Sequence, residues 1–156
     1  PSERTSRPQW QKPDDYLLLA LRNIQKTNMK LQDLGLLAVR LLAGGMMLTH
    51  GIPKIDRLFG EGPVKFADPF GLGPEISLVL VIFAEVACSL LVMVGLKTRL
   101  ATIPLLITML VAAFYIHGAD PFGEKELPLL FFTLFVSLLV SGPGNYTINR
   151  WIGGKK

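Results

Sequence analysis

Four long apolar blocks constrain this chain of 156 residues more than any other feature. They cover residues 34–52, 76–96, 100–118 and 127–141. A helix needs about 20 residues, with a lower limit near ~17, to cross a hydrocarbon core of ~30 Å, so the first three blocks are long enough. The fourth is short, but Pro128 suits a first helical turn and the stretch can extend from residue 126 to 142. A soluble bundle would need polar outer faces, which these blocks lack. The sequence therefore predicts an all-α integral membrane protein with a bundle of four transmembrane helices.

The segment before the first block divides into a polar tail and a helix. Residues 14–32 favour a helix, because Asp14 and Asp15 suit its start and leucine and isoleucine recur at helical spacing. Its cations lie on other faces, which favours an interfacial helix on the membrane, although a solvated helix docked on a partner subunit fits nearly as well. We expect three regions: a tail with a cytoplasmic amphipathic helix at 1–33, the membrane domain at 34–148, and a basic C-terminal tail at 149–156.

The distribution of basic residues predicts the orientation of the chain. Eleven of the 16 lysines and arginines flank the blocks on one side: Arg4, Arg7, Lys12, Arg22, Lys26, Lys30, Lys97, Arg99, Arg150, Lys155 and Lys156. Four lie on the other side: Lys54, Arg57, Lys65 and Lys125. The positive-inside rule then predicts that both termini are cytoplasmic. The net charge of +4 comes without a basic patch interleaved with aromatic residues, so the sequence gives no support for nucleic-acid binding.

A five-residue word, ADPFG, occurs twice, at residues 67–71 and 119–123. Asp-Pro-Phe-Gly favours a type I turn. Each copy follows a His-Gly pair, at His50 or His117, and we expect each pair to end a helix. We therefore expect two matched helical hairpins with similar outer corners. His50 and His117 should lie at similar depth, each near an aspartate of the repeated word, Asp68 or Asp120.

Two charged residues fall inside the apolar blocks, where a charge costs at least a few kcal/mol. Arg40 lies roughly 9 Å into the first span from the cytoplasmic end, and Glu85 roughly 14 Å into the second from the outer end. Antiparallel spans would leave about 7 Å between these depths in a ~30 Å core, so we expect a buried Arg40–Glu85 ion pair. Glu85 could equally titrate, or bind a ligand, in a polar pocket. Gly44 shares a face with Arg40 and would let another helix come close.

The polar residues of the outer half of the bundle define a candidate pocket that opens outward. With the intramembrane arginine they form one set of candidate ligand-binding residues: Arg40, His50, Lys54, Asp68, Glu85, His117 and Asp120. Their spacing is not that of a metal site, and no catalytic residue can be assigned. Haem ligation by the two histidines is a weaker alternative. The single cysteine, Cys88, excludes an internal disulfide.

The sequence resembles the DoxX family of bacterial membrane proteins between about residues 34 and 148. The resemblance rests on RLLAGGMMLTHGIPK in the first span, FAE in the second, the order of spans, and GPG after the fourth. The family is similar to the DoxD subunit of thiosulfate:quinone oxidoreductase. The resemblance implies a four-helix inner-membrane protein that is part of a redox complex. The first 33 residues lie outside it, which makes them a candidate docking segment for another membrane subunit.

Three functions fit these observations. The first expectation is an accessory or anchoring subunit of a membrane-bound redox or respiratory complex, with no intrinsic cofactor and no catalysis on its own. The alternative is a quinone-reactive subunit, because quinone reduction needs hydrogen-bond donors and a proton source, for which His50, His117 and Glu85 are candidates. The ligand expected in the pocket is a quinone or a lipid. Small-molecule transport is a further alternative.

Overall fold

The computed structural model describes residues 13–152, and every regular element in that range is a helix. The elements are α1 (Pro13–Phe59), α2 (Pro74–Ile82), the π-helical turn η2 (Phe83–Cys88), α3 (Ser89–Val94), α4 (Thr98–Val111), the π-helical turn η3 (Ala112–Ile116), α5 (Phe122–Ser141) and α6 (Ile148–Ile152). The predicted all-α class is confirmed for this part of the chain. The polar tail at 1–12 and the last basic residues, 153–156, lie outside the described residues.

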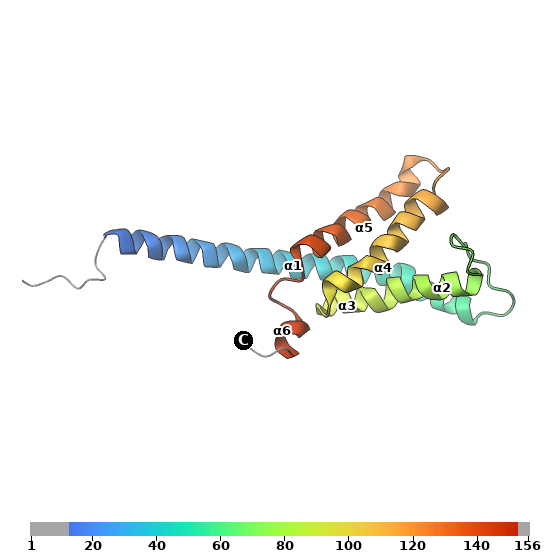
Figure 1. Ribbon diagram of the computed structural model, residues 1–156, viewed down its shortest axis with the longest axis horizontal. Coiled ribbons are helices and arrows are strands. Elements are labelled where there is room, and N and C mark those ends of the chain that lie inside the picture. The colour runs from blue at the N-terminus through green and yellow to red at the C-terminus, as the bar shows by residue number, and fades with distance from the viewer. Residues whose placement is uncertain (1–12, 153–156) are drawn as a thin grey trace, which may run out of the picture.

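Helix α1 is a single helix of 47 residues, about 70 Å long at 1.5 Å per residue. Its N-terminal part, residues 16–34, which we name the α1 arm, projects away from the other helices (Figure 1). Helical structure over residues 14–32 is confirmed. Helix α1 runs through residue 33 without a break, so a separate interfacial helix is not confirmed.

Three helical stretches of the described chain are long and apolar enough to cross a membrane: Tyr16–Phe59, Pro74–Val94 and Thr98–Ile116. The second stretch joins α2, η2 and α3, and the third joins α4 and η3. Helix α5 has the length of a span but carries three charged residues near its start, Glu124, Lys125 and Glu126. A count of four spans is therefore not confirmed by length and composition alone.

The helices pack as two hairpins whose contact forms the core. Helix α1 lies along α2, η2 and α3, while α4 lies along α5 and also contacts η2 (Figure 1). Phe131 and Phe135 of α5 stack with their ring centroids 6.1 Å apart, and they pack with Met47 of α1 and Leu105 of α4 in the buried cluster. Many large apolar side chains outside this cluster are exposed, as expected for helices surrounded by lipid.

Two glycines set the register between α1 and the second hydrophobic stretch. A Cβ atom added at Gly51 would lie 2.7 Å from Val86 Cγ2 and 2.9 Å from Glu85 Cβ, and one added at Gly44 would overlap Met93. The close approach expected at Gly44 is thus confirmed, and Gly51 makes a second one. The side chain of Arg40 lies beside Gly95, as the same antiparallel register requires.

This register separates Arg40 from Glu85, so the predicted ion pair between them is wrong. Glu85 lies opposite Gly51, about 15 Å along the helix from the level of Arg40 at 1.5 Å per residue. Glu85 pairs with Lys54 instead. The end of an apolar block does not mark the end of its helix. Helix α1 continues past its apolar block to Phe59, and this shifts the residues that face Glu85.

Arg40 holds the segment that follows α5. Its guanidinium donates to the backbone carbonyl oxygens of Pro143 and Tyr146, and only 1% of the residue is exposed. Asp33, two turns earlier on α1, accepts hydrogen bonds from the backbone N–H and the side-chain amide of Asn145. The Gly-Pro-Gly segment therefore lies against α1, with both glycines at positive φ. Arg40 is fork-shaped, which suits the simultaneous contact with two carbonyl groups.

Candidate functional site

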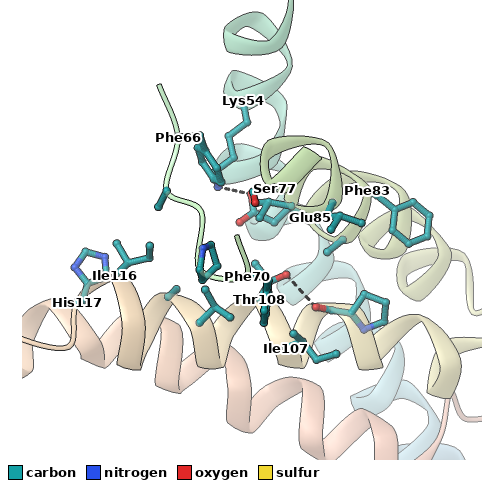
Figure 2. A pocket seen from close by; sticks show the side chains of 18 residues that line it. Lys54, Phe66, Phe70, Ser77, Phe83, Glu85, Ile107, Thr108, Ile116 and His117 are labelled. Carbon is teal, nitrogen blue, oxygen red and sulfur yellow. Dashed lines mark hydrogen bonds and ion pairs between the residues drawn. The ribbon is translucent and has the colours of Figure 1, made fainter. Parts of the chain in front are cut away.

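A cavity of about 540 Å³ lies between α2, η2, α4 and η3 and the loop before α2. Most of its wall is apolar, including Leu80, Phe83, Ile107 and Val111. Phe66 and Phe70 of the loop lie across it (Figure 2). Its volume is within the range of roughly 300–1,000 Å³ that small-molecule sites occupy. The arrangement is typical of a site for a largely apolar ligand whose few polar groups meet fixed partners.

An ion pair between Lys54 of α1 and Glu85 of η2 forms one polar part of the wall. The side chains are 21% and 5% exposed, respectively. The close contact at Gly51 brings α1 against Glu85, and Lys54 follows one turn later on the same face. An ammonium group carries three donors, so Lys54 keeps donor capacity for a second acceptor while it is paired with Glu85.

Both π-helical turns border the cavity. In η2, Phe83, Ala84 and Glu85 line it, and in η3, Ala112 and Ile116 do so. The N–H of His117 donates to the carbonyl of Ala112 at 3.0 Å, the wider repeat of a π-helix. Such turns are rare and occur frequently at functional sites. Here they fix the positions of Glu85 and His117. With Lys54, these two are the ionisable residues that line the cavity.

His117 lines the cavity away from the ion pair (Figure 2). Its Nδ1 is 2.9 Å from Oδ2 of Asp120, and this contact orients the ring. With the Nδ1 proton donated to Asp120, Nε2 is an acceptor in the neutral imidazole and a donor in the protonated one. Asp120 therefore acts through His117 and is not itself a lining residue.

Asp68 closes the turn that leads into α2. Its carboxylate accepts hydrogen bonds from the N–H groups of Gly73 at 2.8 Å and Leu72 at 3.0 Å, and from the hydroxyl of Ser77 at 2.8 Å. These bonds, that of Gly73 first, lower the pKa of Asp68 from its ordinary value. The residue holds the loop that carries Phe66 and Phe70 over the cavity.

The structure brings together only part of the predicted set. Lys54, Glu85 and His117 line one cavity, with Asp68 and Asp120 hydrogen-bonded to the residues around it. Arg40 lies elsewhere, in the contact with the C-terminal segment. His50 lies outside the cavity wall, where its ring meets that of Phe131 edge-on with centroids 6.0 Å apart.

The two copies of the repeated word build different corners. After His117 the helix ends, and Gly118 lies in close contact with the carbonyl of Phe114, where a Cβ would overlap. After His50 the helix continues for nine more residues. Gly51 is not among the glycines with positive φ, so it does not end the helix, and it contacts the neighbouring helix instead. The expectation that both His-Gly pairs end a helix is confirmed at 117 and wrong at 50.

Most of the lining residues were not predicted from the sequence, among them Phe66, Phe70, Ser77 and Thr108. Phe70 belongs to the repeated word, and Ser77 lies one helical turn after Gly73. Their closeness to Asp68 in the sequence is a weak indication that they lie near the same site. Thr108 donates its hydroxyl to the carbonyl of Pro104 at 3.0 Å, which is an ordinary intrahelical bond and carries no sequence signal for a site.

Comparison with known proteins agrees with this membrane architecture. The DoxX family model matches residues 35–118. The chain is 31% identical over 132 residues to "Inner membrane protein YqjF" of Escherichia coli strain K12, covering 81% of this chain and 98% of the relative. It is 30% identical to an uncharacterized membrane protein of Mycobacterium tuberculosis, covering 73% and 78% of the two chains.

The name of a third relative indicates oxidoreductase activity for that relative. The chain is 26% identical over 126 residues to "Putative oxidoreductase CatD" of Bacillus subtilis, covering 80% of this chain and 92% of the relative. No solved structure matches the chain. The family match covers more than half of the chain, and the relative in E. coli is matched over nearly its whole length. The chain is therefore a membrane protein that belongs to the DoxX family.

Proposed function

We propose that this protein is an inner-membrane subunit of an oxidoreductase assembly and that it binds a quinone-type ligand in the cavity beside Lys54 and Glu85. One observation carries the proposal: an apolar cavity of about 540 Å³, at the level of the membrane spans, has a part-buried ion pair in its wall and a histidine elsewhere on it. A quinone has an apolar ring and two carbonyl acceptors. The resemblance to a quinone oxidoreductase subunit supports this class of ligand, and the name of the relative "Putative oxidoreductase CatD" supports redox chemistry.

The residues of the cavity fit such a ligand. Phe66, Phe70 and Phe83 supply aromatic and apolar surface, while Lys54 and protonated His117 supply N–H donors for acceptor oxygens. Glu85 adjoins Lys54 and can exchange a proton with it. When bound, a quinone would supply two-electron chemistry, and the chain would bind it, orient it and exclude water. This geometry favours the quinone-binding function over an anchoring role alone.

The electron donor would belong to a partner. The chain has one cysteine, Cys88, which is buried in the helical core, so it has no dithiol of its own. An accessory position in a larger assembly therefore remains part of the proposal. Residues 1–33, which precede the family match, are the candidate docking segment.

The proposed topology has four spans, with α5 as the fourth. Its first-turn charges would then lie in the outer headgroup region, where Lys125 donates to the carbonyl of Gly118 at 2.8 Å. Both termini would be cytoplasmic, in agreement with the distribution of lysine and arginine. A tag at the C-terminus should be inaccessible to a membrane-impermeant reagent in intact cells, and labelling there would contradict this topology.

Binding is tested by titrating the purified protein in lipid nanodiscs with a short-chain quinone and following its thermal stability. We expect saturable stabilisation of the native protein, as for any ligand that binds only the folded state. The double variant Lys54→Met/Glu85→Leu removes the polar pair without leaving a single charge and should lose most of the stabilisation. Thr133→Val, on an exposed face of α5, is the control. Equal stabilisation of all three proteins, or none of the native protein, would reject the proposal.

A further inference from the structure

The α1 arm has an apolar seam on a face that contacts nothing in the described chain. Five positions separated alternately by four and three residues follow this seam: Leu17, Leu21, Ile24, Asn28 and Leu31. Their leucine and isoleucine side chains are between 53% and 63% exposed. Spacing of 3.5 residues on average is the repeat by which two helices supercoil around each other, and these are its a and d positions.

The same repeat continues into the membrane part of α1. Its next positions are Gly35, Ala38, Leu42 and Gly45, and a Cβ at either glycine would meet nothing within 4 Å. The face that packs on the other helices lies on the opposite side of α1, where Arg40, Ala43 and Met47 are buried. Small residues let membrane helices approach each other closely. The seam therefore extends from residue 17 to 45, and no other part of residues 13–152 covers it.

Charge is absent from the seam. The arm's basic residues, Arg22, Lys26 and Lys30, lie on the far side of the helix. The positions that flank the seam are uncharged: Leu18, Ala20, Gln25, Thr27, Gln32 and Leu34. The α1 arm is a straight continuation of the helix that packs in the bundle, and it projects away from the other helices (Figure 1). These features favour a second helix of the same kind as the occupant.

We propose that two copies of this chain associate in parallel through the α1 seam, with Asn28 facing Asn28. Copies that insert by the same route have the same orientation, so their α1 helices are necessarily parallel. A single asparagine at an a position specifies register and a two-stranded state at a cost in stability, which explains a polar residue within an apolar row. This interface does not depend on the proposed quinone site, because it lies on the opposite face of α1.

Disulfide crosslinking of full-length protein in native membranes tests the interface. In a Cys88→Ala background, Ile24→Cys is a seam variant, and Lys26→Cys, two residues away on the far side, is its matched control. Identical d positions of a parallel pair come within disulfide range, whereas far-side positions do not. We expect mild oxidation to convert Ile24→Cys into a dimer and to leave Lys26→Cys monomeric. Equal crosslinking of the two variants, or none of Ile24→Cys, would overturn the proposal, and burial of Ile24→Cys in lipid alone would show a surface-bound arm instead.

Asn28→Leu provides a second readout that does not need cysteines. The mass of the assembly in nanodiscs or mild detergent should change from a uniform dimer to a mixture that includes larger species, because the residue that limits the number of strands is gone. Lys26→Leu should leave the dimer unchanged. If Asn28→Leu leaves both the mass and the stability of the assembly unchanged, position 28 is not buried in an interface and the proposal fails.

Discussion

Gly51 of α1 lies directly against Glu85 of η2, and a Cβ atom added at Gly51 would be only 2.9 Å from that of Glu85. This contact brings the two helices close enough for Lys54, one turn further on, to pair with the Glu85 carboxylate inside the membrane region. The ion pair and the cavity beside it thus depend on the absence of a side chain at residue 51.

Gly51→Ala should destabilise the bundle by about 1–3 kcal/mol, the usual cost of inserting a methyl group into a well-packed contact. The neighbouring atoms belong to the backbone and Cβ of Glu85 and to Val86, and these cannot move aside as a long side chain could. Thermal unfolding in nanodiscs measures the effect. Gly123→Ala, in the first turn of α5 with nothing within 4 Å, is the control and should be neutral. Equal effects at the two positions would contradict the close contact.

Lys54→Met should be strongly destabilising, by about 3–5 kcal/mol, because it leaves a buried carboxylate without its partner. Adding Glu85→Leu to this variant should restore much of the stability, since the unpaired charge is removed. The comparison is a double-mutant cycle on the denaturation of purified protein. Additive losses from the two substitutions would show that the residues do not interact.

Arg40→Lys should release the segment after α5, because an ammonium group cannot reproduce the fork that contacts the carbonyls of Pro143 and Tyr146. Each lost hydrogen bond to a charged group costs roughly 1.5–3 kcal/mol. Faster amide hydrogen exchange over residues 142–147 is the expected result. The same substitution at Arg22, on the exposed α1 arm, is the matched control. Unchanged exchange in Arg40→Lys would contradict the role assigned to Arg40.

The turn before α2 should loosen in acid. Hydrogen bonds lower the pKa of Asp68 from its ordinary value of 3.8, so its contribution to local stability is present above that value and is lost as the pH falls through the lowered one. Hydrogen-exchange protection at Leu72 and Gly73 should therefore decline in that range. In Asp68→Asn, protection should be low at all pH values, whereas Asp56→Asn, on an exposed part of α1, should match the native protein. A pH-independent native protein would contradict this prediction.

The sequence predicted the apolar helices well, because hydropathy reports directly on burial in lipid. It could not predict their register, because a hydropathy pattern does not show how far a helix continues past its apolar residues. Helix α1 passes through Gly51 and Pro53 to Phe59, which moves Arg40 away from Glu85 and brings Lys54 to it. Lys54 therefore forms the ion pair with Glu85 that was expected of Arg40.

The candidate site was predicted in part, for a related reason. Glu85 was selected because a charge is costly in a membrane, and Lys54 and His117 because they are polar residues near the outer ends of their spans. The three line one cavity. His50 was selected by its likeness to His117, but similar words in sequence do not guarantee similar geometry. The loop residues Phe66 and Phe70 were missed, since aromatic residues in a loop do not reveal which surface they cover.

Photolabelling with an azidoquinone in native membranes tests the proposed function most directly, because it reports where the ligand lies. The peptide segments 66–85 and 104–117, which border the cavity, should carry the label, and an excess of unmodified quinone should remove it. The Lys54→Met/Glu85→Leu variant should be labelled much less. Labelling confined to exposed residues outside the cavity, such as Leu90 and Leu130, and unaffected by competitor, would contradict a quinone site in this cavity.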